Sequence, residues 1–316
     1  MPAFTSIPSA LAEVSTVSGA QGIELLLYRM RAGRRDAPVI VLGHCNGFSA
    51  GCYLPLLERL ADEADVYAFD QRGHGGSQAP DAPSGYTADA LADDVAAIID
   101  AVARCRPGAA ISYVGHSLSA AAILHLAITK PARYGAMNLA HVVLIEPPVF
   151  PGSDHPLFAE CTQSTIELIA RTHRRRTRWP SKLAYTQALT GRGPFANFAP
   201  GMLAAVAQAS LRPKGTGYVL ACAAVTEARI FALWGQAILF PVLARMPATH
   251  PVLLVSGDPM AGPGRDWVTA MMSHVASRID HARLVVKPGR GHLWPFEAPD
   301  EVVAFIQTET LPGRPA

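Results

Sequence analysis

The sequence has little that would hold a metal ion, a nucleic acid or a membrane. Its five cysteines are odd in number and scattered, without the Cys-x-x-Cys or Cys/His clusters of a zinc site or a disulfide framework, so we expect reduced thiols. The 27 Lys and Arg residues nearly balance the 25 Asp and Glu residues, which leaves a formal net charge of +2 and no basic footprint for nucleic acid. No stretch approaches the roughly eighteen apolar residues of a membrane span, and the first residues lack the pattern of a signal peptide. These absences predict a soluble, cytoplasmic protein that acts on a small molecule, with no nucleic-acid or membrane partner. The cysteines are Cys45, Cys52, Cys105, Cys161 and Cys222.

Half of the 316 residues are hydrophobic, and they form short runs that predict buried strands. The runs cover residues 24–30, 38–44, 65–70, 111–116, 141–146, 251–258 and 282–289. Helical patterns separate them, as at 87–105, where acidic residues come early and Arg104 comes late. Because strands and helices alternate, the sequence predicts an α/β fold with a doubly wound, mostly parallel sheet.

The alternation stops between residues 149 and 250, where the patterns are helical or irregular and no strand is evident. We therefore expect a core formed by residues 1–148 and 251–316, with a mainly helical lid inserted between them. The lid is rich in apolar side chains that would shape an apolar pocket. These include Phe195, Phe198, Phe231, Trp234 and Phe240.

The stretch "YVGHSLSAAA" at 113–122 places Ser117 directly after a predicted strand and before an alanine-rich helical run. This strand-turn-helix context is typical of the G-x-S-x-G nucleophile elbow, in which small residues must flank a strained serine. Gly115 meets that need, whereas Ser119 replaces the second glycine and is tolerable only if the neighbouring strand is also small. The alternative is that Ser117 or Ser119 merely caps the helix.

A serine nucleophile needs an imidazole base, and the stretch "GRGHLWPFEAPDEV" offers His292. His292 follows the last predicted strand, on a glycine-rich loop ahead of a terminal helix. It is therefore the last member in the order Ser, acid, His.

These stretches, together with "VLGHCNGF" and "YAFDQRGHGGS", resemble the α/β-hydrolase superfamily over residues 38–303. Four shorter segments are similar to a lidded subgroup that includes fungal toxin-biosynthesis and acyl-CoA hydrolases. They are "HCNGF", "LIEPP", "RRRTRWPSK" and "LACAAVTEARIF".

The resemblance leaves two candidates for the triad acid. The usual family position, three residues after Gly257, is occupied by Met260, and Asp258 lies one residue past the glycine. The alternative family position is the end of the strand after the nucleophile, where "HVVLIEPP" provides Glu146. A carboxylate at the end of so apolar a strand needs a partner, and a histidine N–H is a suitable one, so we favour Glu146 over Asp258.

The resemblance also implies an oxyanion hole formed by the backbone N–H groups of Leu118 and Asn46. We expect five residues to line the substrate pocket, although His44 and Cys45 have plausible structural roles as a loop-holding hydrogen bond and a small buried filler. The five are His44, Cys45, Phe48, Trp234 and Trp294.

Two polar segments have simpler interpretations. In "FDQRGHGGS" the side chains of Asp70, Arg72 and His74 are assigned mainly to the strand-end turn. The basic run at 171–178 could bind phosphate, for example of coenzyme A, but a solvated lid-helix face is favoured.

The sequence thus predicts a serine hydrolase that needs no metal or organic cofactor. Ser117 would attack the carbonyl of an apolar ester, thioester or lactone, and water would release the acyl group. A C–C bond hydrolase or lyase with the same triad, and a low-turnover binding protein on the same fold, are the alternatives.

Overall fold

The structure is a computed structural model that describes residues 4–258 and 267–311. Eight strands form one sheet in the order β1-β2-β4-β3-β5-β6-β10-β11. Strands β1 and β2 run antiparallel to their neighbours, and the other pairs are parallel. The mostly parallel, doubly wound sheet is therefore confirmed. The strands are β1 (Ala12–Ser18), β2 (Glu24–Met30), β3 (Val39–Gly43), β4 (Asp65–Phe69), β5 (Ile111–His116), β6 (Leu139–Ile145), β10 (Val252–Ser256) and β11 (Ala282–Val286).

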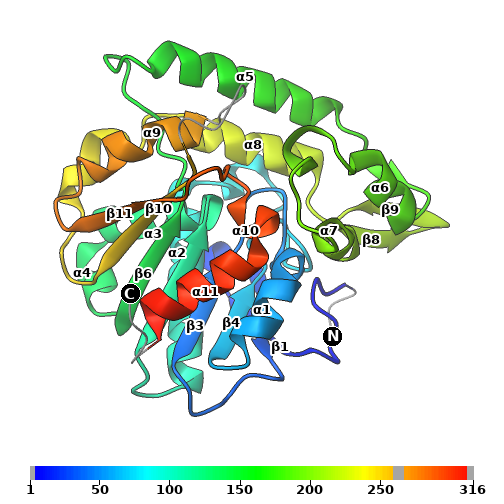
Figure 1. Cartoon of the computed structure of the whole chain (residues 1–316), viewed down its shortest axis with the longest axis horizontal. Helices are drawn as coiled ribbons and strands as arrows, with labels where there is room; N and C mark the ends of the chain where they lie inside the picture. The colour runs from blue at the N-terminus through cyan, green and yellow to red at the C-terminus, as the bar shows by residue number, and fades with distance from the viewer. Residues whose placement is uncertain (1–3, 259–266, 312–316) are drawn as a thin grey trace.

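Helices cover both faces of this sheet, as Figure 1 shows. Helices α1, α10 and α11 pack on one face, and α2, α3 and α9 pack on the other. A hydrophobic core lies on each face of the sheet, and successive strand residues point into the two cores alternately. Val39 and Val41 face α2 and α3, whereas Ile40 and Leu42 face α1 and α11. Burial on both faces explains why the strands read as continuous apolar runs. The helices of the core are α1 (Leu54–Leu60), α2 (Ala88–Cys105), α3 (Leu118–Thr129), α4 (Pro131–Gly135), α9 (Trp267–Ala276), α10 (Trp294–Glu297) and α11 (Pro299–Thr310).

The predicted helix at 87–105 has the expected chemistry at its first turn. Thr87 is the N-cap, and its side chain accepts a hydrogen bond from the backbone N–H of Ala90 at 3.1 Å.

The sequence does not predict strand β1, because β1 is a half-exposed edge strand without an apolar run.

Residues 149–250, called the inserted segment here, lie across one end of the sheet (Figure 1). The segment is mainly helical, but the expectation of no strand in it was wrong. Three short strands form a second sheet in the order β7-β9-β8. Strands of two to four residues leave little pattern in a sequence, which is why they were missed. The elements are α5 (Phe158–Arg174), β7 (Arg178–Trp179), α6 (Lys182–Leu189), α7 (Met202–Ser210), β8 (Leu211–Lys214), β9 (Gly217–Leu220) and α8 (Ala224–Trp234).

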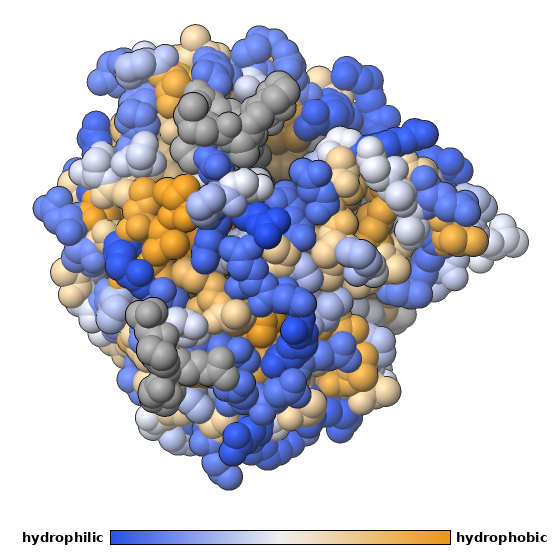
Figure 2. Space-filling view, viewed as in Figure 1, coloured by the Kyte–Doolittle hydropathy of each residue, from blue (hydrophilic) through white to orange (hydrophobic). Residues whose placement is uncertain are grey.

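The face shown in Figure 2 is mostly hydrophilic, with a hydrophobic area beside the edge strand β11. Val286 of that strand is 43% exposed. None of the helices in the described ranges is both long enough and apolar enough to cross a membrane.

The turn after β4 is held by buried polar groups, as the sequence predicts. Arg72 is fully buried and donates two hydrogen bonds to Asp94 of α2, at 2.6 and 2.8 Å. The same guanidinium donates to the carbonyl groups of Gly85 and Ala20 at 2.6 and 3.1 Å. Asp70 is also fully buried and accepts hydrogen bonds from the hydroxyl of Tyr28 and from three other donors. The side chains of Arg72 and Asp70 therefore hold the turn after β4 in place by buried hydrogen bonds.

We expect Arg72→Met to lower the free energy of unfolding by about 3–5 kcal/mol, because it leaves the Asp94 carboxylate buried without its cation. The double variant Arg72→Met with Asp94→Leu should recover part of that loss, since both charges are then gone. Urea denaturation followed by circular dichroism measures both values. A double variant that is no more stable than the single one would contradict this account.

Candidate active site

Ser117 occupies the turn between β5 and α3 in a strained backbone conformation. Its φ is +52° and its ψ is −109°, which is rare for a residue with a side chain. Small neighbours make the turn possible: a Cβ atom on Gly115 would lie 2.9 Å from the backbone of Ala120. Although Ser117 is the N-cap residue of α3, its side chain makes no capping hydrogen bond. The capping interpretation of Ser117 is therefore not supported.

Ser119 fits at the second glycine position because the adjacent strand is small there, as the sequence predicts. A Cβ atom on Gly43 of β3 would collide with the Ser119 hydroxyl. That hydroxyl is fully buried and forms a hydrogen bond with the hydroxyl of Tyr113. Ser119 thus packs between two strands and faces away from solvent.

The side chains of Ser117, His292 and Glu146 form a continuous chain of hydrogen bonds. His292 Nε2 lies 3.1 Å from Ser117 Oγ, and His292 Nδ1 lies 2.7 Å from Glu146 Oε2. Since the carboxylate can only accept, Nδ1 carries the proton, and Nε2 accepts from the serine hydroxyl. The exposed fractions are 18% for the His292 side chain and 1% for that of Glu146. This arrangement can take a proton from Ser117 and stabilise the imidazolium that results.

Glu146 sits directly after β6, also with a positive φ of +46°. Besides His292, its carboxylate accepts hydrogen bonds from the Gly257 N–H at 2.6 Å and from the Thr269 hydroxyl at 2.7 and 2.9 Å. These donors satisfy a carboxylate that is almost completely buried, so its charge does not stand alone.

Asp258 has a different role from Glu146. Its Oδ2 accepts a hydrogen bond from the Gly289 N–H at 3.0 Å, and its own N–H donates to the Arg290 carbonyl at 2.7 Å. The side chain therefore braces the turn that precedes His292. Met260, at the usual family position of the acid, lies outside the described residues.

The backbone N–H groups of the loop after β3 differ in their hydrogen bonding. Cys45 N–H donates to the Tyr53 hydroxyl at 3.2 Å, and Gly47 N–H donates to His74 Nε2 at 3.1 Å. Within residues 4–258 and 267–311, neither Asn46 N–H nor Leu118 N–H has a hydrogen-bond acceptor. These are the two amides that the sequence predicts for the oxyanion hole.

His44 and Cys45 support this loop from beneath. His44 Nδ1–H donates to the Cys45 carbonyl at 2.8 Å, and His44 Nε2 accepts from the Gln71 N–H at 2.9 Å. Burial lowers the pKa of His44 to about 4 and that of His74 to about 3, so both rings are neutral at pH 7. Burial also raises the pKa of the Cys45 thiol. His44 and Cys45 are both buried, so they match the structural roles that the sequence allows, a hydrogen bond that holds the loop and a small buried filler.

The three aromatic residues predicted to line the substrate pocket differ in exposure: Phe48 is partly exposed, and the two tryptophans are buried. Phe48 is half-buried and stacks on Phe296, with 4.9 Å between ring centroids, and Phe198 of the inserted segment stacks on the other side at 5.1 Å. Trp234 and Trp294 are 3% and 1% exposed and lie within the hydrophobic cores, so the expectation that they line a pocket needs correction. A tryptophan that packs in a core and one that lines a cleft look alike in a sequence.

The basic run at 171–178 is mostly exposed. Arg175 forms an ion pair with Glu227 of α8, and the Arg176 guanidinium stacks on the Trp179 ring at 4.3 Å. The other arginines point to solvent, which agrees with the favoured interpretation of a solvated face.

Helix α8 of the inserted segment touches the loop after β3. The Asn46 side chain donates a hydrogen bond to the Glu227 carbonyl at 2.9 Å. A Cβ atom on Gly47 would lie 2.5 Å from the Glu227 carboxylate. The contact therefore fixes the inserted segment beside the unused N–H of Asn46.

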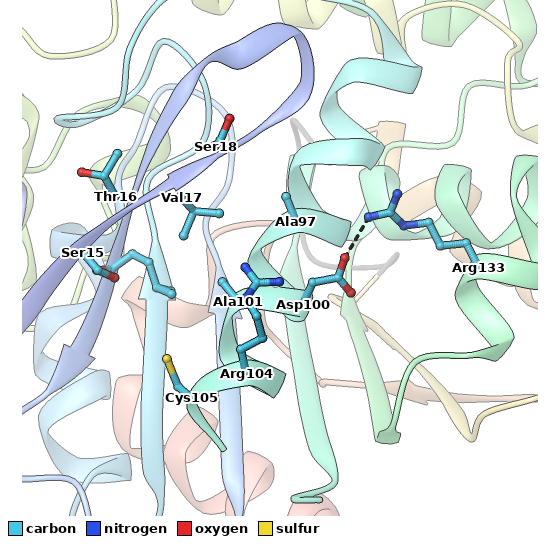
Figure 3. Close-up of a pocket in the computed structure, with 11 residues that line it drawn as sticks. Ser15, Thr16, Val17, Ser18, Ala97, Asp100, Ala101, Arg104, Cys105 and Arg133 are labelled. Carbon is cyan, nitrogen blue, oxygen red and sulfur yellow. Dashed lines mark hydrogen bonds and ion pairs between the residues drawn. The ribbon is translucent and has the colours of Figure 1, made fainter. Parts of the chain in front are cut away.

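A surface hollow of about 570 Å³ lies away from these residues, between β1 and α2 (Figure 3). Its wall includes the Arg133–Asp100 ion pair at 2.9 Å and Arg104, and it shares no residue with the Ser117 site. No group of His, Cys, Asp and Glu suited to a metal ion occurs in the described part of the chain.

Known proteins resemble this chain in sequence and in fold. A 2-(acetamidomethylene)succinate hydrolase from Mesorhizobium japonicum is 38% identical over 99 residues, which cover 31% of this chain and 32% of that protein. A protein from Pantoea ananatis that is named for carbamate hydrolysis is 36% identical over 99 residues, covering 31% of this chain and 34% of that protein. The matches thus span about a third of the length of these relatives.

The crystal structure of E-2-(acetamidomethylene)succinate hydrolase superposes with a TM-score of 0.73 at 24% identity. It covers 94% of this chain and 98% of that one, which establishes a shared fold. The profile of the Alpha/beta hydrolase family matches residues 40–305. This match includes both the turn that carries Ser117 and the loop that carries His292. Because it covers most of the sequence, the chain belongs to the alpha/beta hydrolase family.

Proposed function

We propose that the protein is a serine hydrolase that cleaves an acyl bond through an acyl-enzyme on Ser117. The observation that carries this proposal is the hydrogen-bond chain from Ser117 through His292 to Glu146. In the first step Ser117 Oγ attacks the carbonyl carbon while His292 Nε2 takes the hydroxyl proton. The N–H groups of Asn46 and Leu118 stabilise the negative charge on the carbonyl oxygen.

The tetrahedral intermediate then collapses as His292 donates its proton to the leaving group. A water molecule takes the vacated place, loses a proton to His292 and attacks the acyl carbon. The bond between the acyl carbon and Ser117 Oγ then breaks as His292 returns the proton to Oγ, which releases the acid and restores Ser117. Glu146 orients His292 and stabilises its charge in both halves of the reaction. We propose the inserted segment as the lid over this site, because Phe198 and Glu227 contact residues beside it.

The proposed substrate is an ester, thioester or lactone with an apolar acyl group. The support for an apolar group is the aromatic stack of Phe48, Phe296 and Phe198, whose Phe296 ring lies 6.4 Å from the ring of His116, the residue before Ser117. A metal ion or an organic cofactor has no part in these steps.

A second candidate is an acyl group on nitrogen, which the names of the relatives favour. One relative is named for carbamate hydrolysis, and the other is named a 2-(acetamidomethylene)succinate hydrolase. A panel of esters, thioesters and N-acyl compounds with the same acyl group separates the two candidates. We expect the highest kcat/KM for an ester or thioester. An N-acyl compound that equals or exceeds its matched ester would favour the second candidate. Cleavage of C–C bonds by the same triad stays a prediction from the sequence.

We expect a fluorophosphonate probe to label Ser117 in the folded protein, because only an activated serine reacts with it at a useful rate. The labelled residue is identified by mass spectrometry of the digested protein. Ser117→Ala should abolish labelling, and Ser119→Ala, which changes the buried serine of the same motif, should retain it. Folded wild-type protein that stays unlabelled would instead support a binding protein on the hydrolase fold.

We expect Glu146→Gln to lower kcat on a p-nitrophenyl ester by roughly 10³–10⁴-fold, since an amide beside His292 Nδ1 favours the wrong tautomer. Asp258→Asn should change kcat only a few-fold, because Asp258 braces a turn. Circular dichroism verifies that both variants are folded. A large loss in Asp258→Asn together with a small loss in Glu146→Gln would reassign the acid.

A further inference from the structure

His116, the residue before Ser117, is part of a second hydrogen-bond chain beneath the triad. It is 1% exposed, and its Nε2 lies 2.9 Å from the backbone carbonyl oxygen of His292. Its Nδ1 lies 2.6 Å from the hydroxyl of Tyr53, which is also 1% exposed. The same hydroxyl accepts a hydrogen bond from the Cys45 N–H at 3.2 Å. The chain thus runs from the loop of Asn46 to the loop of His292.

Only one arrangement of protons satisfies these contacts. The His292 carbonyl oxygen can only accept, so His116 Nε2 carries a proton and donates it. Burial and the nearby His292 keep the pKa of His116 well below its usual value, so the ring is neutral and Nδ1 accepts. Burial raises the pKa of Tyr53, so its hydroxyl stays protonated and donates to Nδ1. Every hydrogen bond in the chain, from the Cys45 N–H to the His292 carbonyl, then joins one donor to one acceptor.

The chain joins the three segments that must stay in register during catalysis. Cys45 N–H is one residue before the proposed oxyanion donor Asn46, His116 is one residue before Ser117, and the accepting carbonyl belongs to His292 itself. Ring contacts support the same geometry, because Phe296 lies 4.8 Å from Tyr53 and 6.4 Å from His116 between ring centroids. The hydrogen bonds that tie Tyr53 and His116 to the site are made with backbone groups, the Cys45 N–H and the His292 carbonyl. The His116 ring also lies 5.3 Å from the His292 ring between centroids.

We propose that Tyr53 and His116 are positioning residues, which hold the His292 imidazole and the Asn46 N–H at their distances from Ser117. This proposal rests on the proposed serine hydrolase function. Removing the chain would leave both loops free to shift while the triad residues themselves remain. A misplacement of about 1 Å at a catalytic group is expected to cost on the order of 100-fold in rate.

Two substitutions of His116 separate its two hydrogen bonds. The amide nitrogen of a glutamine can reach the place of Nε2 and keeps the donor to His292, whereas the shorter asparagine reaches only the place of Nδ1 and loses that donor. Tyr53→Phe removes the hydroxyl and keeps the ring packing on Phe296. The matched control is Tyr28→Phe, which removes an equally buried hydroxyl that donates to Asp70 at 2.7 Å, away from the triad.

The experiment measures kcat and KM for a p-nitrophenyl ester and the rate of fluorophosphonate labelling, at a temperature where every variant is folded. We expect Tyr53→Phe and His116→Asn to lower kcat and the labelling rate by roughly 10–100-fold with KM changed less than threefold. His116→Gln, which keeps the donor to His292 but loses the acceptor for the Tyr53 hydroxyl, should lose less kcat than His116→Asn. Tyr28→Phe should lose thermal stability but keep its kcat.

Three results would overturn the proposal while the proposed function still stands. One is wild-type kcat in Tyr53→Phe and His116→Asn, and another is a loss of kcat in Tyr28→Phe as large as theirs, which would indicate a general effect of stability. The third is an equal loss in His116→Gln and His116→Asn, which would show that the donor to His292 is irrelevant. If Tyr53→Phe does not fold, the two His116 variants decide the question. Wild-type protein that neither labels nor turns over would overturn the proposed function itself, and this proposal with it.

Discussion

The register of β5, β6 and β10 is the constraint on which the site depends. His116 pairs with Ile145 and Ile145 pairs with Val255, so these three strands end at nearly the same level. The ladder continues one residue further, because Ser117 N–H donates to the Ile145 carbonyl at 2.8 Å and Glu146 N–H donates to the Val255 carbonyl at 2.9 Å. Ser117, the proposed nucleophile, and Glu146, the proposed acid, therefore leave neighbouring strands side by side, about 5 Å apart in the sheet direction. One imidazole can then span the gap between their side chains.

This placement has an energetic cost that the surrounding structure offsets. Ser117 and Glu146 both adopt positive φ, which costs on the order of 1–3 kcal/mol for each residue with a side chain. The ladder hydrogen bonds hold both backbones, and the Glu146 carboxylate is tied further to Gly257 and Thr269. Glu146 is thus held by its own strand, by the end of β10 and by α9. His292 is the member with the most freedom, since it is on a loop and is partly exposed.

Much of this arrangement could be predicted from the sequence, because it follows from local patterns. The strand ends and the turn of Ser117 follow from apolar runs and from small residues around Ser117. The sequence favours Glu146 because it ends an apolar strand at an alternative acid position of the resembling family. Other features depend on contacts between distant residues. The hydroxyl of Tyr53 meets His116 across 63 positions, and His116 meets the His292 carbonyl across 176. Trp234 and Trp294 failed as pocket residues because a sequence does not show which side of a helix the fold covers.

The four histidines near the site differ in burial, and this difference affects which of them can accept the proton of Ser117. His44, His74 and His116 are almost fully buried, and burial lowers the pKa of each ring, so they remain neutral when the proposed reaction creates a cation on His292. A charged His116, with its ring centroid 5.3 Å from that of His292, would oppose that cation by like-charge repulsion. Keeping His116 neutral removes this opposition and still provides the donor that holds the His292 backbone. Burial makes these three rings poor bases, whereas His292 contacts both Ser117 Oγ and the Glu146 carboxylate and is therefore the proposed base for the Ser117 proton.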